Sequence, residues 1–397
     1  MKRAAPALEA ALSRLAQRQL QRGRTTVEAL APDSRVVALA GGRELIDFSS
    51  NDYLGLARHP ALAAAMSACA ARAGAGSGAS HLVTGHGAEH EHLEEELAAF
   101  TGRERALLFS TGYMANLAVM SALAGRGERV LLDRLCHASL IDGAILSGAV
   151  LRRYRHADSQ AAARLLGSDG ARTALLATDG VFSMDGDLAP LPELARVARA
   201  QDAWLVVDDA HGLGVVGASG RGALEHFGLG VEEVPVLIGT LGKAFGSFGA
   251  FVAGGADLIE YLIQTARTYI YTTALPQPVA AATRRALELA QAESWRRERV
   301  LALTARFRRH AQQAQVPLGD SATPIQPVVL GSAAAALAAQ RVLQEAGLWV
   351  VAIRPPTVPQ GSARLRITLS AAHTEAQVDE LVAQLARACA RAPSLGP

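Results

Sequence analysis

The hydrophobic positions of the chain fall into short apolar runs, separated by longer segments whose apolar residues have helical spacing. Between about residues 60 and 255 the runs are ALLF near 106, RVLLD near 129, TALLAT near 173, AWLVVDD near 203, VPVLIGT near 234 and GAFVAG near 249. Runs this apolar are typical of strands that are buried on both faces. Their alternation with helices predicts an α/β fold with a mostly parallel central sheet and helices on both faces.

The two ends of the chain have a different pattern. The sequence predicts a helix over Leu8–Leu20 and short strands over Val36–Leu39 and Leu45–Phe48. After residue 278 it predicts one long helix over 279–312, then a mixture of strands and helices: IQPVVLG, a helix over 333–346, LWVVAIR, RLRITLS and a last helix from 374. We therefore expect three segments: 1–58 with an N-terminal helix and small strands, 59–278 as the large domain, and 279–397 as a smaller C-terminal α+β domain.

Composition narrows the possible partners and the location. The 397 residues include 39 lysines and arginines and 37 acids, so charge gives no reason to expect nucleic acid or a membrane surface as a partner. Cys69, Cys136 and Cys389 are far apart and lack metal-ligand spacing, which predicts no metal site and no disulfide. No run of about 18 apolar residues occurs. We expect a soluble, cytoplasmic protein.

Polar residues collect where the apolar runs end. In open α/β sheets ligands bind outside the carboxyl ends of the strands, so these positions are candidates for chemistry. They are the turn STGYMAN over Ser110–Asn116, then His137, then Asp208 with His211, then Thr240 with Lys243. The turn opens a helix, and the free N–H groups of a helix start suit an anion such as phosphate.

Lys243 lies in the segment IGTLGKAFGSFGA, among four glycines and almost no other charge. A lysine is strongly hydrated and costly to enclose, so this setting points to chemistry rather than to a surface position. Enclosure is expected to lower its pKa and make the neutral amine accessible. Pyridoxal 5′-phosphate needs a lysine amine, an aspartate facing its pyridine nitrogen and a phosphate-binding helix start, and the strand-end residues supply each.

Each strand-end feature also has a plainer interpretation. The STG turn can be an ordinary helix cap, His137 a structural histidine, and DDAHG a turn. A metal site built from Asp208 and His211 lacks a third ligand. The segment GLGVVG over Gly212–Gly217 matches a dinucleotide-binding fingerprint in its letters, but no helix is expected to follow it. TLGK lacks the first glycine of a P-loop. Only the set taken together favours the cofactor.

A series of motifs along almost the whole chain resembles the α-oxoamine synthases, a family of fold-type I pyridoxal phosphate enzymes. The motifs are SSNDYLGLA, GSGASHLVTG, STGYMAN, DRLCHASLIDGA, DGVFSMDGD, VDDAHGLGVVG, TLGKAFG and ARLRITLSAAH. The resemblance implies an aminotransferase-like fold and an acyltransferase that uses pyridoxal 5′-phosphate. It also implies a homodimer with sites at the interface.

The resemblance assigns cofactor roles to the strand-end residues. Lys243 is implied as the Schiff-base lysine, Asp208 as the partner of the pyridine nitrogen, His137 as the side chain stacked on the ring, and His211 as the group at its phenolic oxygen. The other implied cofactor contacts are the backbone of Gly112 and Tyr113, the hydroxyls of Ser183 and Thr240, and Thr272 reaching a neighbouring subunit's phosphate.

The resemblance also assigns substrate contacts. Arg366, assisted by Asn51, is implied to grip the amino-acid carboxylate, and His137 to protonate or hydrogen-bond the new ketone oxygen. Thr357 is implied to lie beside the acyl substrate, and Arg22 at the end of its chain. One position departs from the family pattern, because Asp179 stands where a glutamate usually precedes GVFSMDGD.

The implied reaction is a decarboxylative condensation of an amino acid with an acyl thioester. The segment AIRPPTVPQG most resembles the family member that joins L-alanine to pimeloyl-CoA or a pimeloyl-acyl carrier protein. Two alternatives stay open: a sister enzyme that uses glycine with an acetyl or succinyl thioester, and a noncatalytic partner subunit of the same fold. Retention of Lys243, Asp208 and both histidines argues against the noncatalytic subunit.

Overall fold

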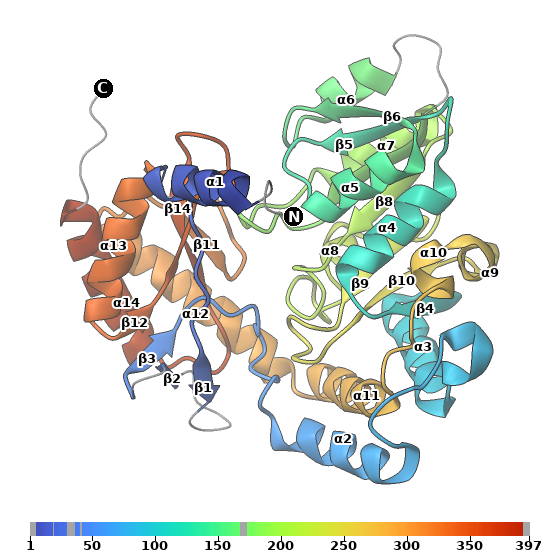
Figure 1. The fold of residues 1–397 in the computed structure, drawn as a ribbon, viewed down its shortest axis with the longest axis horizontal. Helices are drawn as coiled ribbons and strands as arrows, with labels where there is room; N and C mark the ends of the chain where they lie inside the picture. The colour runs from blue at the N-terminus through green and yellow to red at the C-terminus, as the bar shows by residue number, and fades with distance from the viewer. Residues whose placement is uncertain (1–4, 19, 30–35, 40–41, 167–172, 392–397) are drawn as a thin grey trace. The chain divides into compact units, whose positions relative to one another are not determined.

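The computed structural model describes residues 5–18, 20–29, 36–39, 42–166 and 173–391. The chain divides into two compact units (Figure 1). The small unit comprises Met1–Ser50, Met184–Gly186 and Val300–Pro397, and the large unit comprises Asn51–Ser183 and Asp187–Arg299.

The large unit is built around one sheet. Among the described residues it has seven strands in the order β4-β10-β9-β8-β7-β5-β6. The strands are β4 (Arg105–Phe109), β5 (Arg129–Asp133), β6 (Val150–Tyr154), β7 (Thr173–Asp179), β8 (Trp204–Asp208), β9 (Val236–Thr240) and β10 (Ala250–Gly254). Only β10 runs antiparallel to its neighbours, β4 and β9. The expected mostly parallel sheet is confirmed.

Successive residues of each strand pack on opposite faces of this sheet. In β5, Val130 and Leu132 belong to one buried cluster and Leu131 belongs to another. The first cluster contains residues of α4 (Gly112–Leu123), α5 (Ala138–Ser147) and α9 (Ala256–Thr265), and the second contains residues of α6 (Ser159–Leu166), α7 (Leu191–Ala200) and α8 (Ala223–Phe227). Both faces are therefore covered by helices, which explains why the strands are apolar throughout.

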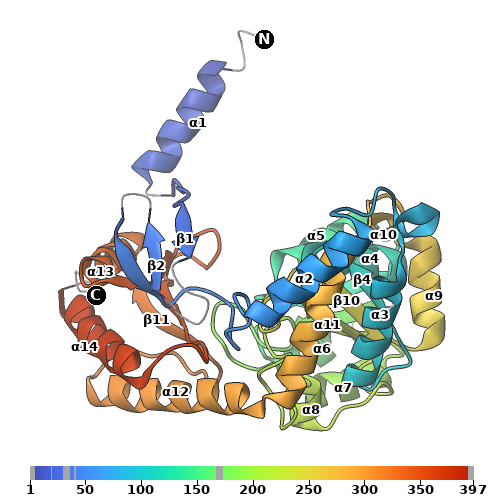
Figure 2. The same ribbon diagram turned by 90° about the horizontal axis from the view of Figure 1, so that it is seen from below.

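Further helices complete the large unit. They are α2 (Pro60–Ala73), the single π-helical turn η1 (His81–Gly85), α3 (Ala88–Thr101), α10 (Arg267–Ile270) and α11 (Gln277–Ala292). Helices α2, α3 and α11 lie side by side at one end of the unit (Figure 2). Local sequence sets their limits: Pro60 occupies the first turn of α2, and Gly102 ends α3 in the left-handed conformation.

The small unit contains two small sheets. One has the order β1-β2-β3-β12, formed by Val27–Ala29, Val36–Leu39, Glu44–Asp47 and Leu348–Trp349. The other is antiparallel, with the order β11-β14-β13, formed by Ile325–Gly331, Ala363–Thr368 and Val351–Ile353. Its helices are α1 (Ala5–Gln17), α13 (Ala333–Glu345) and α14 (Glu375–Arg391), and α12 (Ser294–Gln313) enters it from the large unit.

Three details differ from the sequence-based expectations. The long helix expected over 279–312 was wrong, because Glu293 adopts φ −106° and ψ 63° and separates α11 from α12. Strand β6 was not anticipated, because its sequence VLRRY is exposed at an edge of the sheet and lacks the apolar signature of the inner strands. The compact units also begin and end at other residues than the three expected segments, since α11 packs on α2 and α3 within the large unit.

In the described part of the chain, no helix combines the length and the apolar character that crossing a bilayer requires.

Candidate active site at the carboxyl edge of the large sheet

The strand-end residues meet at one edge of the large sheet. Strands β5, β7, β8 and β9 are mutually parallel, so their carboxyl ends share that edge. The register places Asp179, the last residue of β7, directly opposite Asp208, the last residue of β8. His137 follows β5 at the start of α5, and Lys243 follows β9 in a turn. The strand ends that carry the predicted site residues therefore lie along one edge of the sheet, and the roles of those residues stay predictions.

Lys243 and His211 form a hydrogen-bonded pair. The Nζ atom of Lys243 lies 2.8 Å from Nε2 of His211. On the other side of the ring, the hydroxyl of Tyr53 lies 2.7 Å from Nδ1 of His211 and donates to Oδ1 of Asn51 at 3.3 Å. Because that hydroxyl proton points to Asn51, the hydroxyl oxygen accepts from Nδ1–H, and Nε2 is left to accept from Lys243. His211 is buried, so this orientation is fixed by the protein.

Sequence reasoning did not identify Tyr53. It is only 1% exposed and lies two residues from Asn51, inside the motif SSNDYLGLA. Nothing in the local pattern separates its hydroxyl from an ordinary buried tyrosine, because its partner His211 is 158 residues away.

We expect Tyr53→Phe to lower the free energy of unfolding of the cofactor-free protein by about 1–3 kcal/mol, because the buried Nδ1 of His211 loses its partner. Urea unfolding measures the change. Tyr271→Phe is the control, since Tyr271 is 71% exposed. Equal effects of the two substitutions would show that the Tyr53 hydroxyl has no such part in the fold.

Asp208 is held on both of its oxygens. Oδ2 accepts from Nδ2 of Asn116 at 2.7 Å, and Oδ1 accepts from the N–H of Ala210 at 3.1 Å. The same Nδ2 donates to Oγ of Ser139 at 2.7 Å. Asp208 is 7% exposed, so it keeps a small accessible area at the edge of the sheet. Asn116 and Ser139 are further residues that the sequence patterns did not single out.

His137 has an accessible ring beside Asp208. It is the N-cap of α5, and its Nδ1 lies 2.6 Å from Oγ of Ser139. Desolvation by the surrounding protein lowers the pKa of His137, and Lys243 acts in the same direction, whereas Asp208 and Asp142 oppose it. The neutral imidazole is therefore favoured.

Asp179, the departure from the family pattern, keeps a contact with the site. Its Oδ1 accepts from the backbone N–H of His137 at 3.1 Å. Burial and the nearby charge of Asp208 raise the pKa of the Asp179 carboxyl well above its usual range. The shorter side chain thus still anchors the start of α5.

The expected phosphate end lies at the N-terminus of α4. Thr111 caps this helix by accepting from the N–H of Met114, which leaves the first-turn N–H groups of Gly112 and Tyr113 without an intrahelical acceptor. A Cβ atom added at Gly112 meets no atom within 4 Å, so the space before the helix is open. The hydroxyl of Thr240 donates to the carbonyl of Gly249 at 3.2 Å.

Two further residues predicted to contact the cofactor lie in the large unit. Ser183 lies in the turn after Phe182, and Thr272 lies in the loop after α10, where it is half-buried. Their roles stay predictions.

The predicted acyl-substrate residues meet within the small unit. Nη2 of Arg22 donates to Oγ1 of Thr357 at 3.0 Å. They line a cavity of about 550 Å³ together with Arg24, Trp349 and Arg354. Arg366 belongs to the same unit, in the centre strand β14 of the antiparallel sheet, and is 7% exposed.

The sequence matches the family of class I and II aminotransferases over residues 43–385. It is 62% identical to an 8-amino-7-oxononanoate synthase of Methylococcus capsulatus, over 95% of this chain and 97% of that protein. A second relative of the same name, from Thioalkalivibrio sulfidiphilus, is 60% identical over 95% of this chain and 96% of its own length. The chain belongs to the 8-amino-7-oxononanoate synthase family. The resemblance noted in the sequence is thereby confirmed.

Two solved structures of related enzymes have a fold similar to that of this synthase-family chain. A Francisella tularensis 8-amino-7-oxononanoate synthase has a TM-score of 0.76 and 33% identity, covering 86% of this chain and 97% of that one. A serine palmitoyltransferase from S. paucimobilis, solved with a bound PLP–myriocin aldimine, has a TM-score of 0.90 and 30% identity, covering 96% of each chain. The fold-type I class is confirmed.

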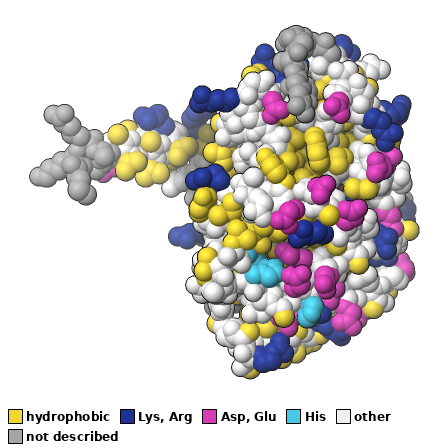
Figure 3. All heavy atoms as spheres, turned by 90° about the vertical axis from the view of Figure 1, so that its right-hand side faces the viewer, with side chains coloured by type: hydrophobic (Ala, Val, Ile, Leu, Met, Phe, Trp, Pro, Cys, Tyr) yellow, Lys and Arg dark blue, Asp and Glu magenta, His cyan; other side chains and the backbone are white. Residues whose placement is uncertain are grey.

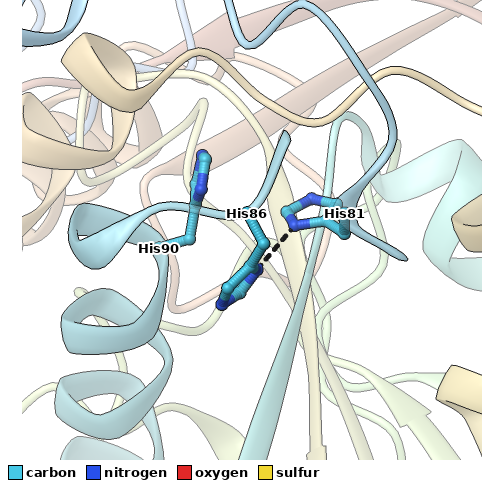
Figure 4. A group of neighbouring side chains, drawn as sticks. All are labelled: His81, His86 and His90. Carbon is cyan, nitrogen blue, oxygen red and sulfur yellow. Dashed lines mark hydrogen bonds between the residues drawn. The ribbon is translucent and has the colours of Figure 1, made fainter. Parts of the chain in front are cut away.

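Two other segments of the large unit have the residue pattern of a ligand site, Gly212–Gly217 and the histidines near 81–90. The segment Gly212–Gly217 forms turns and opens no helix, so rejecting the dinucleotide fingerprint is confirmed. His81, His86 and His90 have ligand atoms within 4.8 Å of one another (Figure 4). However, Nδ1 of His90 accepts from the N–H of Gly87, and its Nε2 bonds the carbonyl of Leu275. His90 is thus committed to the fold, and we assign no metal to the group.

Proposed function

We propose that this chain condenses L-alanine with a pimeloyl thioester of coenzyme A or acyl carrier protein, giving 8-amino-7-oxononanoate, carbon dioxide and the free thiol carrier. This is an acyltransferase reaction of biotin biosynthesis. The observation that carries the proposal is the pairing of Lys243 with His211 beside Asp208, at one edge of the sheet, in a chain 62% identical to a synthase of that name.

The cofactor is pyridoxal 5′-phosphate, and the residues of the large unit fit it. Lys243 offers an amine for its aldehyde, Asp208 offers a buried carboxylate for its pyridine nitrogen, and the open start of α4 offers N–H groups for its phosphate. When bound, the cofactor supplies an electron sink for the charge left on the amino-acid Cα.

The side chains around the cofactor hold it in place and transfer protons. The Lys243 amine is the base for the Cα proton of alanine, and His211 holds that amine in place through its Nε2. Asp208 keeps the ring nitrogen protonated, and Asn116 and Ala210 keep Asp208 oriented. His137, with its accessible ring, donates a hydrogen bond to the ketone oxygen as it forms.

The acyl thioester occupies the cavity of the small unit. Three arginines line it, Arg22, Arg24 and Arg354, so it suits an anionic group. The hydrogen bond from Arg22 to Thr357 supports placing both residues at the acyl substrate. Arg366 and Asn51 are proposed to bind the carboxylate of alanine.

We include a homodimer and a cytoplasmic location in the proposal. The large unit exposes several large apolar side chains, and apolar atoms gather on the side where α3 and α9 lie (Figure 3). The exposed apolar side chains of the large unit include Leu82, Val83, Ile145 and Leu146. A second copy of the chain covering such side chains would bring Thr272 toward a neighbouring phosphate. The free thiols of Cys69, Cys136 and Cys389 suit a reducing compartment.

The deciding experiment measures thiol release by the purified protein with alanine or glycine against pimeloyl, acetyl and succinyl thioesters. Activity confined to alanine with a pimeloyl thioester supports the proposal. A preference for glycine with acetyl or succinyl thioester would transfer the chain to the sister activity, and release with no pair at all would favour the noncatalytic subunit.

We expect Arg366→Ala to weaken alanine binding at least about tenfold, because charge-assisted hydrogen bonds contribute roughly 1.5–3 kcal/mol each. Cofactor binding should not change. The affinity is measured from the absorbance change of the bound cofactor on titration with alanine. Arg387→Ala is the control, since Arg387 is exposed on α14 of the same unit. Unchanged alanine affinity in Arg366→Ala would refute the assignment.

A further inference from the structure

A continuous line of hydrogen bonds joins Asp208 to His137, and all but its His137 end is buried. From Asp208 it passes to Nδ2 of Asn116, then to Oγ of Ser139, and ends at Nδ1 of His137, with distances of 2.7, 2.7 and 2.6 Å. Asn116 is 1% exposed and Ser139 is fully buried. The four side chains come from β8, α4 and the start of α5, so the line ties three elements together.

Chemistry fixes the direction of the first two hydrogen bonds in this line. An ionised carboxylate only accepts, so the amide nitrogen of Asn116, and not its oxygen, must face Asp208. The second proton of that nitrogen goes to Ser139, whose oxygen therefore accepts from Asn116. The Ser139 hydroxyl can still either donate its proton to Nδ1 of His137 or accept from an Nδ1–H with its second lone pair.

The cap of α5 decides between these two directions, because His137 caps this helix with Nδ1 as an acceptor, so the Ser139 hydroxyl donates to Nδ1 as well. The backbone N–H of Ser139 also points to this nitrogen, at 3.4 Å. With the Nδ1 lone pair occupied by the donors of Ser139, the single proton of the neutral ring must be on Nε2. A doubly protonated ring would set Nδ1–H against two donors.

We propose that Asn116 and Ser139 are positioning residues that use the charge of Asp208 to hold His137 as the neutral Nε2–H tautomer. Its consequence for catalysis rests on the proposed function: His137 gives a hydrogen bond to the substrate oxygen rather than a full proton. Asn116 and Ser139 thus orient two groups at once: Asp208, which is proposed to face the pyridine nitrogen of the cofactor, and His137, which is proposed to stack on the cofactor ring.

Four titratable side chains from different elements surround His137 in the described part of the chain. Asp208 lies at the end of β8, Lys243 in the turn after β9 and Asp142 on α5, and Asp179 at the end of β7 accepts the backbone N–H of His137. Asp208 and Asp142 favour a charged ring, whereas desolvation and Lys243 oppose it. The hydroxyl of Ser139 adds to the opposition, so removing it should make the ring easier to protonate.

The first test uses the unaltered, cofactor-free chain and is independent of the reaction. Nitrogen-15 NMR of histidine-labelled protein distinguishes protonated from unprotonated ring nitrogens, and the His137 signals are identified by their loss in His137→Gln. We expect a proton on Nε2 and none on Nδ1 at pH 7. A ring protonated on Nδ1, alone or together with Nε2, overturns the proposal.

The second test removes the donor. Ser139→Ala should raise the pKa of His137 and populate the Nδ1–H tautomer, because the hydroxyl donor at Nδ1 is lost. Asn116→Ala should also mix the tautomers, because the Ser139 hydroxyl is then free to turn. Ser121→Ala is the matched control, since the Ser121 hydroxyl bonds only backbone carbonyls of its own helix. An unchanged His137 signal in Ser139→Ala overturns the proposal.

The two hypotheses fail separately. If thiol release is absent with every substrate but the NMR result holds, the network stands and the proposed function falls. If alanine and the pimeloyl thioester react but His137 carries its proton on Nδ1, the proposed function stands and the proposed network falls. In the active holoenzyme, Ser139→Ala should lower kcat more than it raises KM for alanine, because the hydrogen bond to the oxygen forms as the reaction proceeds.

Discussion

We expect Lys243→Ala to abolish covalent attachment of pyridoxal 5′-phosphate and to reduce the condensation to background. Borohydride reduction fixes this cofactor to the amine that it is bonded to, and Lys243 holds the amine that pairs with His211. The purified variant should therefore carry no cofactor on its chain after reduction, whereas the unaltered protein carries one cofactor per chain. Mass spectrometry of the reduced protein measures both.

Because the chain has so few lysines, a single control variant covers every other side-chain amine. The chain contains two lysines, Lys2 and Lys243, although lysine and arginine together number 39. Lys2→Ala is thus a complete control for side-chain amines, and it should trap the cofactor as the unaltered protein does. If Lys243→Ala still carries the reduced cofactor on its chain, the assignment of the site is wrong.

The sequence predicted the central sheet, and it predicted which residues end the parallel strands, because both depend on short, local patterns. A parallel strand buried on both faces needs a continuous apolar run, and the residue that follows the run necessarily lies at the carboxyl edge. Asp208 and Lys243 could therefore be placed from their positions alone. The helix start at Gly112 could be placed in the same way, because the capping Thr111 precedes it.

What escaped prediction depends on contacts between distant residues or on exposure. Tyr53 and Asn116 function through partners that are 158 and 92 positions away, and no periodicity marks a hydrogen bond of that kind. Strand β6 is exposed at the sheet edge, so it has no apolar run to reveal it. The break at Glu293 lies between two segments with helical composition, and only the backbone angles expose it.

The Asp179 contact shows a third kind of limit. The sequence could not show whether the Asp179 carboxylate, which is shorter than the glutamate of the family pattern, still makes a contact at the site. The structure places Asp179 level with Asp208 across two neighbouring strands, close enough for Oδ1 to reach the N–H of His137. For this hydrogen bond the length of the side chain matters less than the register between β7 and β8, and the register cannot be read from the sequence.

The second large effect is expected from Asp208→Asn. The substitution keeps the size of the side chain and one of its two acceptor oxygens, so either Nδ2 of Asn116 or the N–H of Ala210 keeps its partner. It removes the charge that holds the pyridine nitrogen protonated. Covalent attachment to Lys243 should persist, because that step needs only the amine and the aldehyde. Removal of the Cα proton of alanine should slow by about 10²–10³, the size of effect seen when one preorganised electrostatic partner is lost. Exchange of this proton with deuterated water measures the rate.

A plain capping role for Asp208 makes a different prediction. Oδ1 of Asp208 accepts from the N–H of Ala210, and asparagine is an equally good cap, so a cap would tolerate the substitution. Asp158→Asn provides the matched control, because Asp158 caps the N–H of Ala161 on α6 at 2.7 Å. We expect normal exchange in Asp158→Asn and slow exchange in Asp208→Asn. If both variants exchange the proton within about threefold of the unaltered protein, Asp208 is a cap, and the electron-sink assignment fails because the charge it depends on has no effect.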